Sequence, residues 1–177
     1  MKKIDVSLLN KEVHFPLILP LPSKETKGIF SKVKSFLFFR RFFEVQEDYI
    51  CWCESLKQWI FLPKRFQFDA ASVPKILNSL YQTTGMLLYG SGPHDFGYRY
   101  EVLIHVDEDT GELFIRNYSR WELDNIFKCL CEAESGLSKT SWIASFILKG
   151  VGYFPWRRYR KNTNVLKPIF PELFITE

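Results

Sequence analysis

A histidine and an aspartate stand side by side in the stretch GPHDFGYRYE, residues 92–101, and both side chains can do chemistry. The imidazole of His94 can take a proton from water near neutral pH, provided that a second group holds the ring and stabilises its charged form. The carboxylate of Asp95 is a hard oxygen ligand of the kind that Ca²⁺ takes. A structural histidine with an ordinary hydrogen bond is the competing interpretation, so the partners of the pair decide between the two.

The helix that follows offers a partner for the histidine. The segment SRWELDNIFKCLCEAE starts with a capping box, in which Ser119 and Glu122 can satisfy each other's backbone N–H groups. Asp124 lies near the start of this predicted helix, and a carboxylate there can orient the ring of His94 and stabilise its imidazolium form. We therefore predict a catalytic dyad of His94 and Asp124. Gly97 is expected to leave space for a substrate beside the imidazole.

A loop earlier in the chain offers a partner for Asp95. Successive helical residues point about 100° apart, so Asp95 is expected to face away from Asp124. The loop at residues 69–71 follows a predicted strand and places the carboxylate of Asp69 beside free backbone carbonyls. Two carboxylates, carbonyl oxygens and water form a ligand set that suits Ca²⁺, which can polarise a substrate carbonyl or bind a phosphate oxygen. We therefore predict a calcium site formed by Asp69 and Asp95.

The elements that must position these residues include two hairpins. Residues 43–53 and 57–69 have strand patterns and are joined by a short polar turn at residues 54–56. Residues 102–117 form a second hairpin pattern around the turn signal DEDTG. Both hairpins are expected to pack against helices.

Helix patterns fill much of the remaining chain. One helix is expected to open at Ser72 with Pro74 in its first turn, and others are expected over residues 86–100 and 141–151. The pattern predicts an α+β fold, in which an N-terminal β-hairpin region packs on a helical core that carries the His-Asp helix and an inserted hairpin. A single domain over residues 1–177 fits a chain of this length with 46% hydrophobic residues.

The net charge of +4 is unevenly distributed. Residues 24–43 hold six Lys or Arg against one acid, and residues 156–167 hold five against none. Basic, aromatic-rich flanks suit an anionic partner, either a phosphate-rich lipid surface or nucleic acid, whereas solvated faces beside a core are the plain alternative. The aromatic run is expected to divide between the core and an exposed apolar patch bordered by cations; the residues are Phe36, Phe38, Phe39, Phe42 and Phe43, with Lys32, Lys34, Arg40 and Arg41.

No secretory signal or membrane span is evident in the sequence. The apolar run FPLILPLP is interrupted by prolines and lacks a small-residue cleavage site, and WIASFILKGVGYF is shorter than the roughly 18 to 20 residues that a bilayer requires. We therefore expect synthesis in the cytoplasm. No feature specifies an oligomeric state.

Four cysteines occur as two C-x-C pairs, Cys51 with Cys53 and Cys129 with Cys131. The members of such a pair share one face of a strand but diverge by about 200° in a helix, which serves a four-cysteine zinc site poorly. Buried free thiols are expected, ahead of a disulfide or zinc. The two remaining histidines, His14 and His105, fall in predicted strand or loop and have no comparable acidic neighbours.

Four segments, IFLPKRFQFDAASVPKIL, HDFGY, SRWELDNIF and ILKGVGYFPW, resemble DUF1353, a phage and prophage family of domains of unknown function. The resemblance implies a family core at residues 43–156, preceded by an N-terminal extension at 1–42 and followed by a basic tail at 157–177. Three residues depart from the family pattern, because Arg65, Phe68 and Leu123 stand where Gly, Thr and Ala are usual.

The motif HDFGYR is similar to the core motif of the prokaryotic secreted phospholipases A2, which also place an aspartate on the next long helix. The resemblance implies that His94 is the general base, that Asp124 orients it, and that Asp69 and Asp95 bind calcium. Gly92 departs from that family, which has a disulfide cysteine two residues before the histidine.

The leading hypothesis is a phage-related, calcium-dependent lipid ester hydrolase that residues 24–43 seat on an anionic membrane. Cytosolic calcium is scarce, so such a protein would act outside the producing cell, for instance after packaging in a virion. The alternative is a non-catalytic virion or tail-associated protein that binds other virion proteins and in which His94, Asp95 and Asp124 form a buried polar network. Nucleic acid is the least favoured partner.

Overall fold

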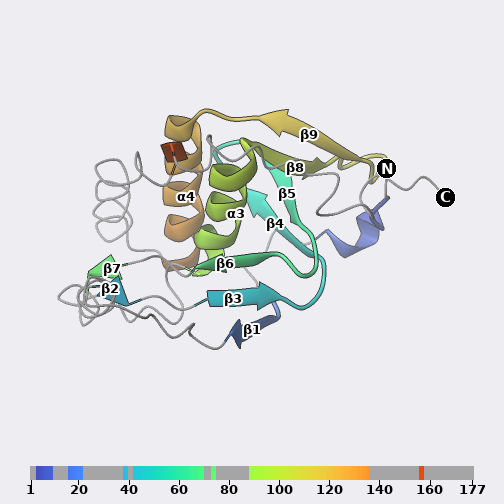
Figure 1. Ribbon diagram of the computed structural model, residues 1–177. Coiled ribbons are helices and arrows are strands. Elements are labelled where there is room, and N and C mark those ends of the chain that lie inside the picture. The colour runs from blue at the N-terminus through green and yellow to red at the C-terminus, as the bar shows by residue number, and fades with distance from the viewer. Residues whose placement is uncertain are drawn as a thin grey trace.

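The fold is known from a computed structural model, which describes residues 3–9, 16–21, 38–39, 42–69, 73–74, 88–135 and 156–157. In this part of the chain two helices pack with antiparallel sheets, so the expected α+β class is confirmed (Figure 1). The elements in chain order are η1 (Val6–Leu8), β1 (Ile18–Leu21), β2 (Phe38–Phe39), β3 (Phe42–Val45), β4 (Tyr49–Cys53), β5 (Gln58–Leu62), β6 (Gln67–Asp69), β7 (Val73–Pro74), α3 (Leu88–Tyr100), β8 (Val102–Val106), β9 (Leu113–Asn117) and α4 (Arg120–Ser135).

A long bent hairpin runs from β3 to β6. β4 pairs with β5 and β3 pairs with β6 in one continuous register, although the two pairs belong to different sheets. The two long strands predicted over residues 43–53 and 57–69 are therefore each broken in the middle. Pro63 cannot donate a ladder hydrogen bond, and Arg65 has a positive φ of 68°, so the second strand bends there. The Arg65 N–H still donates to the Val45 carbonyl at 2.7 Å, which holds the two arms together at the bend.

The two halves of the bent hairpin enter separate sheets. β1, β3 and β6 form a three-stranded sheet in that order, and the inserted hairpin of β8 and β9 joins β5 in a four-stranded sheet of order β4-β5-β8-β9. The hairpin predicted over residues 102–117 is confirmed. β2 pairs with β7, so Val73 and Pro74 lie in a strand, and the prediction that Pro74 lies in the first turn of a helix is wrong. Proline is tolerated at a strand edge, where its missing N–H breaks no ladder. Residues 75–87 and 141–151, where helices were also predicted, lie outside the described part of the chain.

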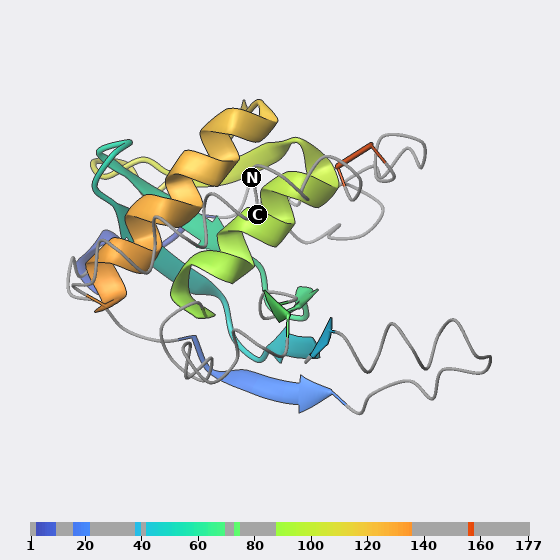
Figure 2. The ribbon, with the colours of Figure 1, turned by 90° about the vertical axis from the view of Figure 1, so that its left-hand side faces the viewer.

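α3 and α4 lie side by side against the sheets (Figure 2). The predicted capping box opens α4, because the Ser119 N–H donates to Glu122 Oε2 at 2.7 Å and the Glu122 N–H donates to Ser119 Oγ at 3.4 Å. α3 ends where the Glu101 N–H donates to the Gly97 carbonyl and Glu101 takes a positive φ of 63°. That left-handed residue reverses the chain into β8. No helix among these residues is long and apolar enough to cross a membrane.

The core lies between the helices and the sheets and is rich in aromatic side chains. The Phe66 ring stacks on Phe68 at 6.2 Å and meets Phe96 of α3 edge-on at 5.0 Å. Phe43 packs against this core, whereas Phe42 is 37% exposed, so the expected division of the aromatic run holds for this pair. Nothing is described of the side chains of Phe36, Phe38 and Phe39 or of the cations expected to border them.

The four cysteines are free thiols. Cys51 and Cys53 are buried on one face of β4, as expected for a C-x-C pair in a strand, and Cys131 is buried on α4. Cys129 is half-buried. Among the described residues, no three Cys, His, Asp or Glu side chains converge in a way that could hold a metal ion.

His105 is fully buried in the four-stranded sheet, which the sequence did not indicate. Its Nδ1 lies 3.0 Å from the Trp59 carbonyl, which can only accept, so Nδ1 carries the proton. The Tyr118 hydroxyl then donates to Nε2 at 2.9 Å. This arrangement requires a neutral ring, and burial lowers the pKa of His105 to about 4. Neither hydrogen-bond partner of His105 is acidic, which agrees with the expectation that it has no comparable acidic neighbours, and Trp59 lies far away in the sequence.

The free energy of unfolding should therefore depend on pH through His105. Its pKa is about 4 in the folded chain and near 6.5 when unfolded, so its neutral form stabilises the fold above about pH 6.5. That stabilisation, roughly 3 kcal/mol, is lost as the pH falls from about 6.5 to about 4. Urea unfolding of the natural chain and of His105→Gln at a series of pH values would show a smaller acid loss in the variant. An imidazole of His105 that titrates near pH 6.5 by NMR would contradict this account.

Candidate active site

α3 approaches α4 closely because glycines line the contact. A Cβ atom at Gly97 would collide with the side chain of Leu123, and one at Gly90 would lie 2.8 Å from Cys131 Sγ. A larger residue at either position would require the neighbouring side chain or helix to shift. The expectation that Gly97 leaves space for a substrate is wrong, because Leu123 occupies that space. The close approach instead brings His94 on α3 level with Asp124 on α4.

The predicted contact between His94 and Asp124 is present. His94 Nε2 lies 3.2 Å from Asp124 Oδ1, and both side chains are buried, with Asp124 fully inaccessible and His94 5% exposed. The ring of Phe127, which lies on α4, is 5.2 Å from the imidazole and covers it on the side of that helix. An ionised carboxylate can only accept, so Nε2–H donates to Asp124 and the lone pair is left on Nδ1. The geometry thus prepares Nδ1 as the basic nitrogen.

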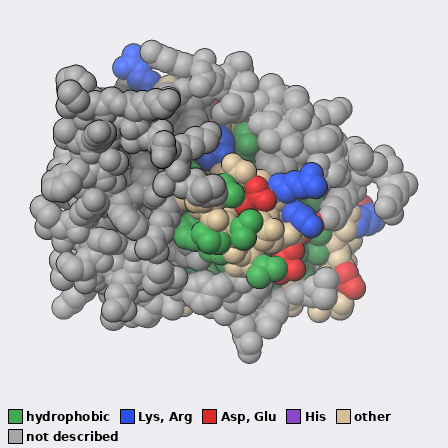
Figure 3. Space-filling model, turned by 60° about the horizontal axis from the view of Figure 1, so that its bottom comes forward, with side chains coloured by type: hydrophobic (Ala, Val, Ile, Leu, Met, Phe, Trp, Pro, Cys, Tyr) green, Lys and Arg blue, Asp and Glu red, His purple; other side chains and the backbone are tan. Residues whose placement is uncertain are grey.

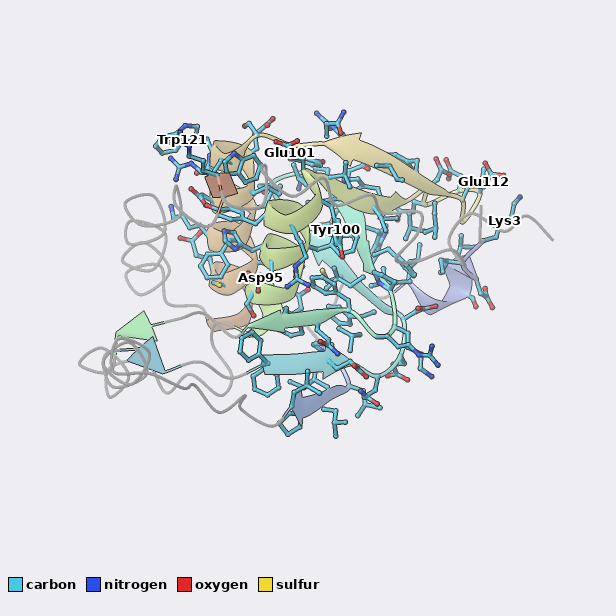
Figure 4. The ribbon with its side chains drawn as sticks, viewed as in Figure 1. Lys3, Asp95, Tyr100, Glu101, Glu112 and Trp121 are labelled. Atoms are coloured by element: carbon cyan, nitrogen blue, oxygen red, sulfur yellow. The ribbon has the colours of Figure 1, made fainter. Side chains whose placement is uncertain are left out.

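Asp95 lies at the other edge of the imidazole. Its Oδ1 is 3.6 Å from His94 Nδ1, and its side chain is 21% exposed. Asp95 therefore faces away from Asp124, as predicted, but remains beside the basic nitrogen. Figure 4 places it on α3 toward the end of the helix that approaches β6. A group bound at this carboxylate would sit next to Nδ1.

Two further residues complete the surroundings of Asp124. The Tyr98 hydroxyl donates to Asp124 Oδ1 at 2.5 Å, and Arg120 Nη1 lies 3.6 Å from Asp124 Oδ2. Oδ2 has no hydrogen-bond partner among the described residues, so the Arg120 charge is the main compensation for that oxygen. Sequence reasoning missed both residues. The signal was available, because Tyr98 lies one helical turn after His94 and Arg120 one turn before Asp124, which places each on the same helix face.

Burial and the neighbouring carboxylates have opposite effects on the pKa of His94. Burial by itself lowers the pKa, because it disfavours the imidazolium form. The hydrogen bonds and negative charges of Asp124 and Asp95 act in the opposite direction and raise the pKa above its ordinary value. Burial and the bond to Asp124 also raise the pKa of Tyr98, which keeps its hydroxyl as a donor. The dyad can therefore hold a proton on the imidazole more readily than a free histidine.

The position of Asp69 is described only through its backbone. Asp69 ends β6, pairs with Phe42 of β3, and belongs to a strand that packs against α3. Its carboxylate and the residues Ala70 and Ala71 lie outside the described part of the chain. The convergence of Asp69 and Asp95 on one cation therefore stays a prediction.

Comparison with known proteins identifies the family. The family described as Protein of unknown function (DUF1353) matches residues 43–145, more than half of the chain. The chain belongs to the DUF1353 family. The DUF1353 match includes β3 to α4 and hence all four predicted site residues, and it ends before Trp156, where the sequence pattern had placed the end of the core. Trp156 nevertheless meets the ring of Tyr98 edge-on at 5.2 Å. No curated protein and no solved structure matches the chain.

The glycine contact gives a stability prediction. Gly97→Ala should lower the free energy of unfolding by roughly 1 to 3 kcal/mol, because the new methyl group overpacks the helix contact against Leu123. Leu123→Ala should cost roughly 2 to 5 kcal/mol by leaving a cavity. In the double variant the two changes relieve each other, so a urea-unfolding cycle should show a loss smaller than the sum. Ala133→Gly, at an exposed position of α4, is the control and should add to Leu123→Ala without coupling. Additivity of the Gly97 and Leu123 changes would contradict the packing.

Proposed function

We propose that this protein is a phage-related, calcium-dependent lipid ester hydrolase of the phospholipase A2 type. The observation that carries the proposal is the imidazole of His94, held through Nε2 by a buried carboxylate while its other nitrogen lies beside the half-buried Asp95. A general base needs this combination of a fixed ring, a charge that stabilises its protonated form and a free lone pair. The motif HDFGYR, which resembles that of the secreted prokaryotic phospholipases A2, adds the expectation of an ester substrate.

In the proposed reaction His94 Nδ1 takes a proton from a water molecule while the water oxygen bonds to the ester carbonyl carbon. Asp124 stabilises the imidazolium form during this step, and the Tyr98 hydroxyl keeps the carboxylate in place. The ester C–O bond then breaks, and the proton passes from Nδ1 to the leaving alkoxide oxygen. The products are a fatty acid and a lysophospholipid.

Calcium is part of the proposal. The carboxylate of Asp95 is 21% exposed, so a cation from solvent could reach it, and Asp69 would supply a second carboxylate. The bound cation would polarise the ester carbonyl and stabilise its developing negative charge. Asp95 would keep this cation beside Nδ1, so that base and polarised carbonyl meet at one place.

One observation favours a second function. His94 is only 5% exposed, and its partners Asp124 and Tyr98 are buried as well. Such a closed network suits a non-catalytic protein in which the polar contacts fix the packing of α3 on α4. In that case the chain would be a virion or tail-associated protein whose His94, Asp95 and Asp124 serve structure alone.

The dyad is tested by hydrolysis of a short-chain phospholipid dispersed in millimolar calcium. His94→Gln should abolish hydrolysis, and Asp124→Asn should reduce kcat by about 10²- to 10⁴-fold, because the ring loses its charge support. A general base works in its neutral form, so activity should rise as the pH passes upward through the raised pKa of His94. In Asp124→Asn this rise should move to lower pH, because the main group that raises the pKa is gone.

His105→Gln is the matched control, since it replaces another buried histidine on a different element. It should keep the activity of the natural chain wherever it is folded, as judged by its urea-unfolding curve. Absence of phospholipid hydrolysis by the folded natural chain, together with a loss of stability in His94→Gln, would establish the structural alternative.

The calcium component has its own test. Chelation with EGTA should remove hydrolysis, and Asp95→Asn should lose most calcium binding in a calorimetric titration while the fold is kept, because a carboxylate ligand is replaced by a neutral amide. Tyr100→Phe lies on the same helix and provides a control away from the proposed ligands. Undiminished calcium binding by Asp95→Asn would remove Asp95 from the metal site.

A further inference from the structure

Two features of the described residues lie outside the proposed reaction. The first is the outer face of the three-stranded sheet, which exposes Leu17, Leu19 and Phe42. Figure 3 shows hydrophobic side chains on this face, with both acidic and basic side chains beside them. Mixed charge favours no class of partner. The second feature is a contact between two thiols, Cys53 of β4 and Cys129 of α4, and its chemistry is more specific.

The packing of α4 on β4 brings these two thiols together. Cys53 is fully buried at the end of β4, and Cys129 is a half-buried residue of α4 that packs against the same core. Their side chains are hydrogen-bonded to each other. Cys131 points elsewhere, because its Sγ lies only 2.8 Å from where a Cβ atom of Gly90 on α3 would be. The divergence of a C-x-C pair in a helix thus leaves Cys129 for β4.

The turn between β4 and β5 provides hydrogen-bond donors to the thiol pair. Ser55 Oγ lies 3.4 Å from Cys53 Sγ. The hydroxyl and the N–H of Ser55 both hydrogen-bond to Cys129, and the N–H of Leu56 hydrogen-bonds to Cys53. Ser55 is exposed, so this side of the pair lies next to solvent. The half-buried Cys129 is therefore the sulfur that a small molecule from solvent reaches first.

These contacts divide the pair into a reactive and a protected thiol. The Cys53 S–H group and the donors of Ser55 lower the pKa of the Cys129 thiol. Burial and the charge of Glu132, one turn further along α4, act against them but do not prevail. The hydrogen bond to Cys129 and burial raise the pKa of Cys53. Cys129 is therefore the thiolate of the pair, and the thiolate is the nucleophile.

We propose that Cys53 and Cys129 are a site of reversible oxidation, at which a hydroperoxide converts the two thiols to a disulfide between β4 and α4. In the first step the Cys129 thiolate attacks one peroxide oxygen, so that an S–O bond forms, the O–O bond breaks and the other oxygen leaves as hydroxide. This step leaves a sulfenic acid on Cys129. In the second step Cys53 loses its proton and its sulfur attacks Cys129. An S–S bond forms, the S–O bond breaks, and the departing hydroxide takes the proton and leaves as water.

The two steps balance. The two thiols lose two electrons, and hydrogen peroxide gains them and becomes two molecules of water. The first step also prepares the second, because oxidation of Cys129 removes the neighbouring thiolate that raises the pKa of Cys53. The disulfide would join the four-stranded sheet to the helix that carries Asp124.

Other uses of these thiols fit the structure less well. Cys51 and Cys53 are successive residues on one face of β4, so their Cα atoms are about 6.6 Å apart with parallel side chains, near the upper limit for a disulfide. Burial raises the pKa of Cys51 to about 12, which makes it an inert thiol. Among the described residues no third Cys, His, Asp or Glu joins the pair to hold a metal ion.

Treatment of the folded, reduced chain with hydrogen peroxide tests the site. Mass spectrometry of a digest made without reductant should show a disulfide between Cys53 and Cys129, and excess dithiothreitol should reverse it. Cys53→Ser should instead leave a sulfenic acid on Cys129 that dimedone traps, whereas Cys129→Ser should leave Cys53 unoxidised. Cys51→Ser and Cys131→Ser are the matched controls, since each replaces a buried cysteine of the same two C-x-C pairs, and both should form the disulfide as the natural chain does.

Ser55→Ala tests the donors without a change in the core, because Ser55 is exposed. The pH at which iodoacetamide alkylates Cys129 at half its maximal rate should rise by roughly 0.5 to 1 unit, since the thiolate loses one hydrogen bond. Ser7→Ala makes the same change at an exposed serine of η1 and should leave this pH unchanged.

Four outcomes would overturn the proposal. The first two concern the reactive thiol: a half-maximal pH near 9 for Cys129 in the natural chain, and equal effects of Ser55→Ala and Ser7→Ala. The other two concern the product: a peroxide-induced disulfide that joins another pair of cysteines, and equal trapping of Cys53 and Cys129 by dimedone in the two serine variants. An increase in the half-maximal pH confined to Ser55→Ala, together with the disulfide between Cys53 and Cys129, would support it.

Discussion

The carboxylate of Asp124 lies in a place that no solvent reaches, and the arrangement of α3 and α4 depends on satisfying this buried group. Burying an unpaired carboxylate costs several kcal/mol, so it persists only with close donors and a nearby positive charge. His94 and Tyr98 supply two donors from α3, and Arg120 supplies the charge from α4 itself. The donors reach Asp124 only because Gly97 lets the helices approach. A bulkier helix contact would leave the carboxylate uncompensated.

The sheets hold α3 in this position from the other side. A Cβ at Gly92 would lie 2.8 Å from Leu62 of β5, so the helix is packed tightly on the strand as well as on α4. Phe96 meets Phe66, which lies just before β6, and the reversal of the chain at Glu101 ties the end of α3 to β8. The orientation of His94 is thus fixed from two directions, which is the rigidity that either a catalytic base or a structural network requires.

Local sequence signals predicted much of this arrangement. They did not predict the pairing of residues that are far apart in the sequence. The capping box at Ser119 and the hairpin around DEDTG depend on neighbouring residues and were found, and the dyad followed from placing one carboxylate near the start of a helix. The bend at Arg65 divides one hairpin between two sheets, which depends on tertiary packing that no local pattern records. Pro74 has the chemistry of a first helical turn, yet pairing with β2 decides its conformation. The hydrogen bond of the buried His105 is likewise made to Trp59, which is distant in sequence.

β6 links the helix pair to the outer sheet. Phe68 is buried toward the helices, while the next residue, Asp69, pairs with the exposed Phe42. Because β6 packs against α3, the backbone that carries Asp69 and the helix that carries Asp95 belong to one packed unit. A cation held between these two residues, as proposed, would therefore depend on the same packing that fixes His94 beside Asp124.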